Sequence, residues 1–476
     1  MWLLALIALP VLAAAVAFAL PTDRVRPLVL PAAAAFHLAA TAGALADGGA
    51  GSLGGWLGLD PPGRLVLLLL SVLFAVCAVY AVGYLRHRRD LSNRVFVPCL
   101  LLFLAGTTLV ACSQHLGLMW VAVEATTLAT APLIYFNRTP RSIEATWKYL
   151  LVGSVGIALA LLGSFCLAYA SLGEDSSLLF GDLLRRAGHM NRAWLEIAFV
   201  LLLVGYGTKM GLAPMHTWKP DAYGEAPGVV GALLAGGLTN CAFLALLRVF
   251  HVCRAAGEGE YASRLLVVFG LVSIAVAAVF VVGQRDFKRM LAYSSIEHMG
   301  ILVLGVGLGG SGVFAALLHM LNNGLAKAVL FLSAANIHRA FGGRSIDEVS
   351  GAMRRVPLSG TLFLLGFFAV TGSPPFGAFV SQFLILSRAL AADRFLVAGI
   401  TLLLLLVVFV GMGRTVLAMV QGRPSPEAER TGYRDGLLTG APLLIPMAAV
   451  LLLGLHVPEA LERLLRDAAG FLETVP

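Results

Sequence analysis

The sequence predicts an all-α, polytopic membrane protein with about 14 transmembrane helices. Hydrophobic residues make up 59% of the chain and charged residues only 13%, with a mean hydropathy of +0.88. A soluble core cannot absorb so much apolar surface, whereas a helical bundle in lipid can. The net charge of +8 is no sign of nucleic-acid binding, because the arginines cluster in short loops between apolar runs.

Successive apolar runs define the expected spans, since a helix needs about 20 residues to cross a bilayer. The first run has no basic residues before it, so we interpret it as a span and not as a cleaved signal. The expected spans are residues 1–20, 26–46, 64–86, 94–113, 116–136, 146–172, 193–217, 226–251, 263–283, 287–309, 311–338, 358–390, 395–420 and 437–456.

Spans seven and eight contain helix-breaking residues around a charged one. Lys209 lies in an apolar run, and a lysine at membrane depth costs a few kcal/mol unless it faces a polar cavity or a partner. Gly211 and Pro214 follow it, and a Gly-rich segment begins at Pro227. We therefore predict broken helices here, with the chain reaching the surface in between at Lys219.

Span twelve is predicted to be broken as well. The run 358–390 is too long for one crossing and contains Gly-Ser-Pro-Pro at 372–375. Proline removes a backbone donor and clashes with the preceding turn, so the helix must be interrupted there.

The pattern divides the chain into four parts. Spans four to eight and spans nine to thirteen share an outline of charged and broken helices, and an odd number of spans in each makes the second an inverted copy of the first. We expect N-terminal helices in 1–93, a first five-helix repeat in 94–251, a second in 263–420, and a last helix with an amphipathic tail in 437–476. The tail either lies along the outer interface or packs on nothing.

Loop charges predict the orientation. Loops after odd-numbered spans are rich in arginine, as at Arg86, Arg88 and Arg94, whereas loops after even-numbered spans carry about half as much. The positive-inside rule then places the odd loops in the cytoplasm and both termini outside the cell's inner membrane.

Glu124 and Lys209 form the first candidate site for proton transfer. A carboxylate and an amine inside the same half of a membrane protein are typical of a proton relay, and a change in their separation would switch the proton affinity of the lysine. The alternatives are a neutral buried carboxylic acid at Glu124 and a static buried ion pair.

His298, His319 and Lys327 form the second candidate site, with Glu297 beside it. His319 precedes Lys327 by about two turns, on the same broad side of a helix. Histidine loads and releases protons near neutral pH, so we expect a hydrated polar axis here, although a lone histidine is more often a satisfied core residue.

Other polar residues are weaker candidates. Glu144 and Lys148 are spaced i, i+4 at the start of span six, as either a supporting part of a proton path or a solvated surface pair. His216, Lys219 and Asp221 follow the break in span seven and are a candidate inlet or gate.

No motif for a cofactor or a metal is present in the sequence. There is no nucleotide-binding glycine motif in a βαβ setting, no Walker loop and no nucleophile elbow. The six cysteines have no CxxC spacing, and no second histidine lies four residues from either candidate histidine, so we expect no redox centre, no metal site and no disulfide framework.

Several long motifs resemble one family. YGTKMGLAPMHTWKPDAYGEAPG, KRMLAYSSIEHMGI, HMLNNGLAKAVLF and GSPPFGAFVSQF are similar to the antiporter-like proton-conducting subunits of respiratory complex I, Mrp cation/proton antiporters and group 4 membrane-bound hydrogenases. RTPRSIEATWKY, with SSIEHMGI and PPFGAFVS, most resembles the F-type membrane component of hydrogenase-4. The resemblance covers roughly residues 60–420 and implies fourteen spans in two inverted five-helix repeats.

The resemblance also implies roles for individual residues. Glu124 matches the family's span-five glutamate and Lys209 its span-seven lysine, while the second candidate site matches the central axis of spans ten and eleven. The chain departs from the family at Asn240 in span eight and at Gln382 after the span-twelve break, where ionisable residues are usual. An amide cannot store a proton's charge, although it can bind water that passes one.

Three functions follow from these observations. The first is proton or Na⁺ translocation in a multisubunit redox-driven complex, with other membrane subunits and peripheral redox subunits as partners. The second is a structural or docking subunit of such a complex that has lost transport. The third is an Mrp-type cation/proton antiporter, standing alone or paired with a soluble partner in bicarbonate uptake. None involves nucleic acid.

Overall fold

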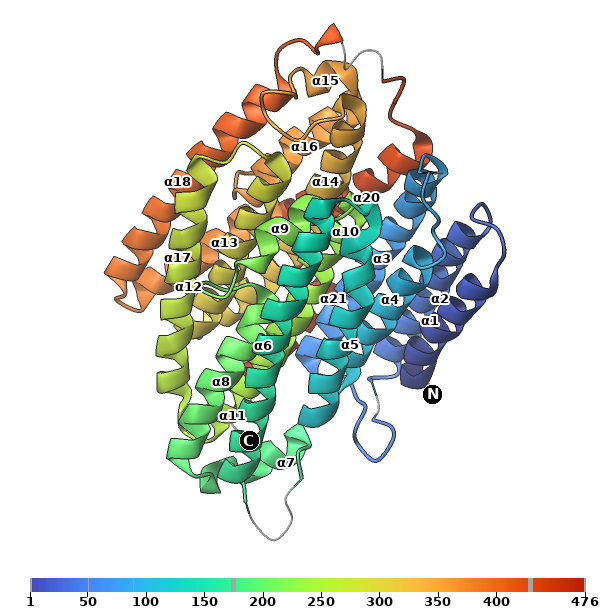
Figure 1. Ribbon diagram of the computed structural model, residues 1–476. Helices are drawn as coiled ribbons and strands as arrows, with labels where there is room; N and C mark the ends of the chain where they lie inside the picture. The colour runs from blue at the N-terminus through green and yellow to red at the C-terminus, as the bar shows by residue number, and fades with distance from the viewer. Residues whose placement is uncertain (1, 50, 89, 173–176, 427–430, 475–476) are drawn as a thin grey trace.

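The chain folds into one bundle of helices (Figure 1). This computed structural model describes residues 2–49, 51–88, 90–172, 177–426 and 431–474. Residues 1, 475 and 476, at the ends of the predicted first and last segments, lie outside this description.

The N-terminal half is made of helices up to the end of the predicted eighth span. They are α1 (Trp2–Ala19), η1 (Arg26–Leu28), α2 (Val29–Ala46), α3 (Pro61–Arg86), α4 (Phe96–Cys112), α5 (Leu116–Ile134), η2 (Tyr135–Asn137), α6 (Pro140–Ala170), α7 (Phe180–Arg186), η3 (Ala187–His189), α8 (Arg192–Met210), α9 (Trp218–Glu225), α10 (Gly228–Leu233), η4 (Leu234–Leu238) and α11 (Thr239–Ala255).

The C-terminal half continues in the same way. Its helices are α12 (Gly259–Val282), α13 (Phe287–Leu308), α14 (Ser311–Phe341), α15 (Ala352–Arg355), α16 (Pro357–Val370), α17 (Gly377–Ala391), α18 (Phe395–Val420), α20 (Leu437–Leu455) and α21 (Glu459–Glu473).

The predicted all-α membrane fold is confirmed. Within the described residues, 12 helices are long and apolar enough to cross a membrane. The shorter helix α4 and the pair α16 and α17 account for the two remaining predicted spans. The protein is therefore a multi-pass membrane protein.

Two of the predicted breaks, in spans seven and twelve, lie where glycine and proline placed them. After α8, Gly211 adopts a left-handed backbone with φ of +80°, and the chain turns before α9 begins. Between α16 and α17, Gly372 has φ of +70° ahead of the two prolines. Glycine adopts this backbone at little cost, so each helix can end inside the bundle.

The predicted break in span eight is wrong, because the helix there is distorted and not interrupted. The backbone runs from α10 into α11 through one π-helical turn, η4, in the Gly-rich segment. An extra residue in one turn rotates the helix that follows and frees backbone carbonyls, so the glycines change the direction of side chains here without ending the helix.

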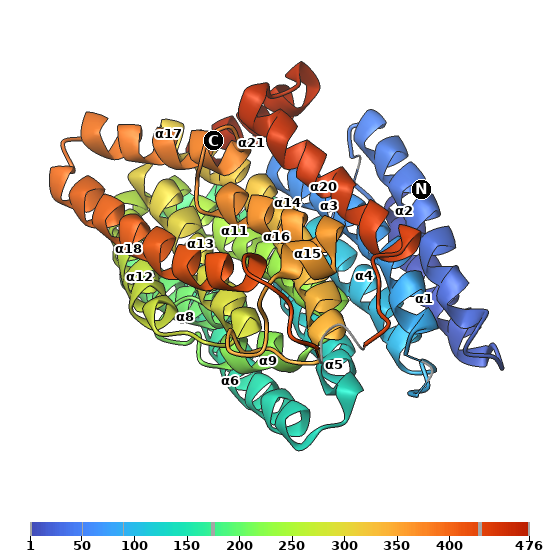
Figure 2. The ribbon, with the colours of Figure 1, turned by 90° about the horizontal axis from the view of Figure 1, so that it is seen from above.

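The bundle has a buried centre and two exposed edges. Figures 1 and 2 show α1 and α2 at one edge and α12 and α18 at the other, with α14 between them. The apolar stretch of α10 to α11 is 100% buried and those of α13 and α14 are 94% buried, whereas those of α1 and α18 are 28% buried. Polar side chains on the central helices are therefore shielded from lipid.

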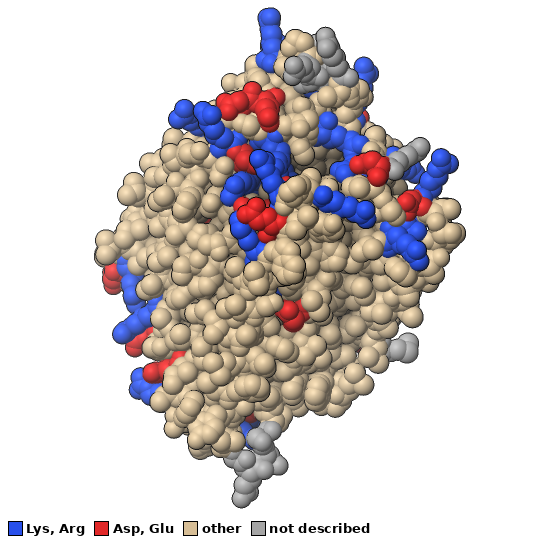
Figure 3. Space-filling model, viewed as in Figure 1, with Lys and Arg blue, Asp and Glu red and all other residues tan. Residues whose placement is uncertain are grey.

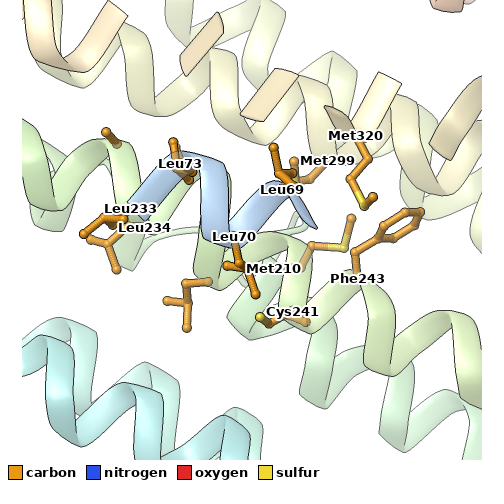
Figure 4. Packing of buried hydrophobic residues seen from close by; sticks show 14 of the residues in the cluster. Leu69, Leu70, Leu73, Met210, Leu233, Leu234, Cys241, Phe243, Met299 and Met320 are labelled. Atoms are coloured by element: carbon orange, nitrogen blue, oxygen red, sulfur yellow. The ribbon is translucent and has the colours of Figure 1, made fainter. Parts of the chain in front are cut away.

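Apolar side chains close the centre around the break. Figure 4 shows leucines of α3 packed near Met210, Cys241 and Phe243, with Met299 and Met320 of the next helices beyond. Met210, Met299 and Met320 each directly follow a residue of a candidate site. Successive helical residues point about 100° apart, so the same helices carry polar side chains on one face and these methionines on the next.

Charged side chains gather toward the ends of the bundle. Figure 3 shows lysine and arginine concentrated at its upper end, with the middle of this face mostly uncharged. This is the distribution that a lipid-facing belt requires.

The amphipathic tail folds back onto the bundle. The helix α21 buries Leu465, Ala468 and Leu472, and it packs on α3, α11 and α14. The Phe471 ring stacks on the His251 ring at 4.6 Å between centroids. Of the two predicted alternatives, a tail that packs on nothing is wrong.

A buried ion pair ties α11 to the start of α3. The Arg248 guanidinium binds both carboxylate oxygens of Asp60 at 2.8 Å and donates to the carbonyls of Val110 and Ala111 at 2.9 and 2.8 Å. Three helices therefore meet at one side chain.

We expect Arg248→Met to lower the free energy of unfolding by about 3–5 kcal/mol, because it leaves the Asp60 carboxylate buried without a counter-charge. Thermal unfolding in detergent measures the effect. Arg264→Met, which removes an exposed arginine paired with Glu260, is the matched control. Equal midpoints for the two variants would contradict this assignment.

Candidate functional site

The structure brings together the first predicted pair. The Lys209 Nζ lies 3.6 Å from the Glu124 Oε2. The Lys209 ammonium also donates to the Thr127 hydroxyl, which donates to the same carboxylate at 3.1 Å. Lys209 is fully buried and Glu124 is 24% exposed. The amine therefore reaches its carboxylate both directly and through a hydroxyl.

Small residues create the space for this amine. A Cβ at Gly153 of α6 would lie 2.7 Å from the Lys209 Nζ, and one at Gly205 of α8 would lie 2.7 Å from backbone atoms of α6. These glycines let α6 and α8 approach closely, as small residues do between membrane helices. The Tyr149 ring lies 5.5 Å from the ammonium, within range of a cation–π contact.

The second site repeats the same three chemical groups. The Lys327 Nζ donates to the Ser294 hydroxyl at 2.7 Å, and this hydroxyl donates to the Glu297 Oε2 at 3.5 Å. As in the first site, the hydroxyl and the carboxylate are three residues apart on one helix, and the lysine is on another. All three side chains are buried. Glu297, predicted only as a supporting residue, is thus the carboxylate of this site.

The two predicted histidines form a directed chain. The His298 Nδ1 lies 2.9 Å from the His319 Nε2, and the His319 Nδ1 lies 2.9 Å from the Ser381 Oγ. The Ser381 hydroxyl donates to the backbone carbonyl of Ala378. That direction makes the His319 Nδ1 a donor, so its Nε2 accepts the proton of the His298 Nδ1 when both rings are neutral.

The free end of this chain is a ring nitrogen without a hydrogen-bond partner among the described residues. The His298 Nε2 is buried, has no hydrogen-bond partner among the described residues, and lies 4.0 Å from the Glu297 Oε2. A proton arriving there would let the His298 Nδ1 proton move to the His319 Nε2, which leaves His319 protonated on both ring nitrogens and still donating to Ser381. Ser381 was not among the predicted residues, because one serine in an apolar helix carries no pattern of its own.

Two buried amides, Asn240 and Gln382, lie on α11 and α17. Asn240, just after the π-helical turn, donates to the Gly236 carbonyl at 2.9 Å, while its Oδ1 has no partner in the described part of the chain. The Gln382 side chain lies against Gly372 in the span-twelve break, and its Nε2 has no partner there either. Buried amide atoms of this kind are positions for bridging water, although neither group ionises.

The weaker candidates lie at the charged end. The Lys148 Nζ is 2.6 Å from the Glu144 Oε1 and 2.9 Å from the Asp221 Oδ2, and Arg289 holds the other oxygen of Asp221 at 3.0 Å. The Glu144–Lys148 pair is about half exposed and lines a surface cavity of about 410 Å³. It is separate from the buried sites.

Within the predicted group of His216, Lys219 and Asp221, the structure points Lys219 and Asp221 in different directions. Lys219 is fully buried, where the sequence analysis placed it at the surface, and its Nζ donates to the Met210 carbonyl at 2.7 Å. Asp221 faces the charged surface instead. The error has a physical reason: the end of α8 offers unpaired carbonyls inside the bundle, which a nearby lysine can cap.

The geometry defines a class of protein. The protein is a multi-pass helical membrane protein with two lysine–hydroxyl–carboxylate sites, each with a fully buried lysine, and with breaks in spans seven and twelve. The chain belongs to the family described as NADH:quinone oxidoreductase/Mrp antiporter, transmembrane, whose model matches residues 113–408. The predicted family is confirmed, and the chain is an antiporter-like membrane subunit.

Individual relatives show which members of the family the chain is similar to. The chain is 34% identical over 420 residues to a hydrogenase-4 component F homolog of Methylacidiphilum infernorum (isolate V4), covering 84% of this chain and 87% of that protein. It matches a chain of respiratory complex I from Thermus thermophilus with a TM-score of 0.77 and 28% identity, covering 96% and 97% of the two chains. A chain of the membrane-bound sulfane sulfur reductase, an archaeal respiratory complex, shares the fold with a TM-score of 0.90 at 23% identity, covering 99% and 98%.

We expect Gly153→Ala to displace the Lys209 ammonium from Thr127, because the new methyl would lie 2.7 Å from Nζ. Loss of this charged hydrogen bond should lower the free energy of unfolding by about 1.5–3 kcal/mol. Thermal unfolding in detergent reports it. Gly399→Ala is the control, since a Cβ at that helical position has nothing within 4 Å. The space around Lys209 would be less tight than described if both variants were equally stable.

Proposed function

We propose that this chain is a proton-translocating membrane subunit of a multisubunit redox-driven complex of the hydrogenase-4 or complex I type. Its family membership and its relatives' names support the kind of complex. One observation carries the proposal for proton transfer: the fully buried Lys209 contacts both Thr127 and Glu124. An amine in this position binds and releases a proton according to the distance of its carboxylate.

The first site acts as the switch. With Glu124 at 3.6 Å, the carboxylate stabilises the Lys209 ammonium. Movement of Glu124 away leaves a charge in a medium of low dielectric, and the ammonium then loses its proton. The partial exposure of Glu124 leaves that side chain free to move, and the adjoining break after Met210 gives α8 a flexible end.

The second site passes the proton on. Lys327 and Glu297 share Ser294 as the first pair shares Thr127. The His298–His319–Ser381 chain then leads from α13 through α14 to α17, at the second break. Asn240 and Gln382 bind water along this route, and Glu144, Lys148 and Asp221 gather protons at the surface.

The proposal includes how the chain is divided and oriented in the membrane. Residues 94–251 and 263–420 act as two inverted five-helix units, flanked by 1–93 and 437–476. The arginine-rich end faces the cytoplasm and both termini lie outside the inner membrane. Peripheral redox subunits supply the driving force, the surrounding lipid seals the bundle, and H⁺, or Na⁺ in its place, is the transported ion.

We expect Lys209→Gln to reduce proton flux by about 100-fold, because glutamine still donates a hydrogen bond but cannot carry a proton. The tagged chain is purified from membranes with its co-eluting subunits and placed in liposomes. A potassium gradient with valinomycin sets the voltage, and a trapped dye reports pH. Arg264→Gln at the exposed surface is the control. Undiminished flux in Lys209→Gln, with a normal subunit composition, would refute the proposal.

A second candidate function is a docking subunit without transport. The amides of Asn240 and Gln382 favour this function. Each has a buried atom without a hydrogen-bond partner among the described residues, and neither amide can hold a proton.

The variant Gln382→Lys separates the two functions. If the chain transports protons, an amine beside the histidine chain should store a proton and raise the flux in the same liposomes. Gln421→Lys, at an exposed loop position, controls for added charge. A flux unchanged by Gln382→Lys and already absent in the parent would favour docking.

A further inference from the structure

Lys219 is a fully buried lysine that neither site described above uses. We propose that it holds a proton between Lys209 and Lys327 and thereby joins the two halves of the path. The proposal rests on the proposed function, and it assigns a role to a residue at the centre of the break in span seven.

The first support is the position of the Lys219 ammonium on the Lys209 side. Its Nζ donates to the carbonyl of Met210 at 2.7 Å, and Met210 directly follows Lys209 at the end of α8. The last carbonyls of a helix carry partial negative charge and have no partner in the helix. Lys219 therefore lies at the one end of α8 where a positive charge is stabilised without a carboxylate.

The second support is the space kept for this side chain. A Cβ at Gly211 would lie 2.5 Å from the Lys219 Cδ and 2.9 Å from its Nζ, and Gly211 has φ of +80°. Trp218 caps the same helix end by donating from Nε1 to the Thr208 carbonyl at 2.8 Å. The break is thus shaped around the lysine and its neighbouring tryptophan.

The third support is the contact with the second site. Lys219 and Lys327 are both fully buried, and an aromatic pair links Lys219 to α14, the helix that carries Lys327. The Tyr223 ring, 5.7 Å from the Lys219 Nζ, packs edge-on against Phe331, one turn beyond Lys327 on α14. Mutual repulsion in a low dielectric disfavours two protons at once, so a proton on one lysine promotes release from the other.

The fourth support is what Lys219 lacks. Among the described residues, no carboxylate lies within 4 Å of its Nζ, unlike Lys209, and its ammonium donates to a single carbonyl. Lys288, by comparison, donates to the two carbonyls of Gly224 and Ala226. A neutral amine still donates one hydrogen bond, so the Met210 carbonyl keeps its partner in both protonation states. Lys219 can therefore discharge without leaving a buried polar group unpaired.

The transfer moves one proton and no electrons. The Lys209 ammonium gives a proton to the neutral Lys219 amine and becomes neutral itself. The Lys219 ammonium then gives one N–H proton to the neutral Lys327 amine and returns to its neutral form. Asn240, on the helix α11 that packs on α8, cannot take either proton because an amide does not ionise.

The test compares three substitutions in the reconstituted complex used above. Lys219→Gln keeps a donor for the Met210 carbonyl but carries no proton, and Lys219→Arg keeps the charge but does not release it. Lys219→His restores a group that binds and releases protons near neutral pH. We expect proton flux to fall at least about tenfold in the Gln and Arg variants and to recover partly in the His variant. Thermal unfolding and subunit composition are measured on each preparation.

The outcomes separate this inference from the proposed function. Normal flux in Lys219→Gln, alongside lost flux in Lys209→Gln, would overturn the role of Lys219 and leave the proposed function standing. Normal flux in both would overturn both. If Lys219→Gln and Lys219→His lose flux to the same extent at unchanged stability, the residue does not relay protons and the inference also fails.

Discussion

The structure depends on the cost of burying an ammonium group in a bilayer. Lys209, Lys219 and Lys327 are all fully buried, and each meets this cost through specific partners. Lys209 and Lys327 share a hydroxyl with a carboxylate, whereas Lys219 caps the end of a helix. Because a charge in low dielectric is stable only beside such groups, the helices that supply them are fixed relative to one another.

Helix breaks and glycines make these contacts geometrically possible. A continuous helix would satisfy its own carbonyls and offer none to a side chain. The break at Gly211 exposes the carbonyl that Lys219 binds, and Gly153 leaves room for the Lys209 ammonium. The same devices explain why the centre tolerates so much polarity: each of these three buried lysines has a hydrogen-bond acceptor to bind.

The two halves repeat chemistry more closely than sequence. In each, a lysine reaches a glutamate through a hydroxyl three residues from that glutamate, yet the order along the chain is Glu124 then Thr127 in one and Ser294 then Glu297 in the other. The two sites therefore resemble each other in spatial arrangement and not in a sequence motif that could be aligned. The second half adds a histidine chain, which gives it a direction toward α17.

The sequence alone determined the membrane class, the spans, the breaks in spans seven and twelve and the pairing of Glu124 with Lys209, since segment hydrophobicity, helix breakers and isolated charges are local properties. Only the tertiary structure decided that Lys219 turns inward while Asp221 turns outward, that Ser381 ends the histidine chain, and that the Gly-rich stretch of span eight bends through a π-helical turn. Each of these features depends on which helix end or side chain lies opposite the residue. Only the packing of segments that are distant in the sequence determines that neighbour.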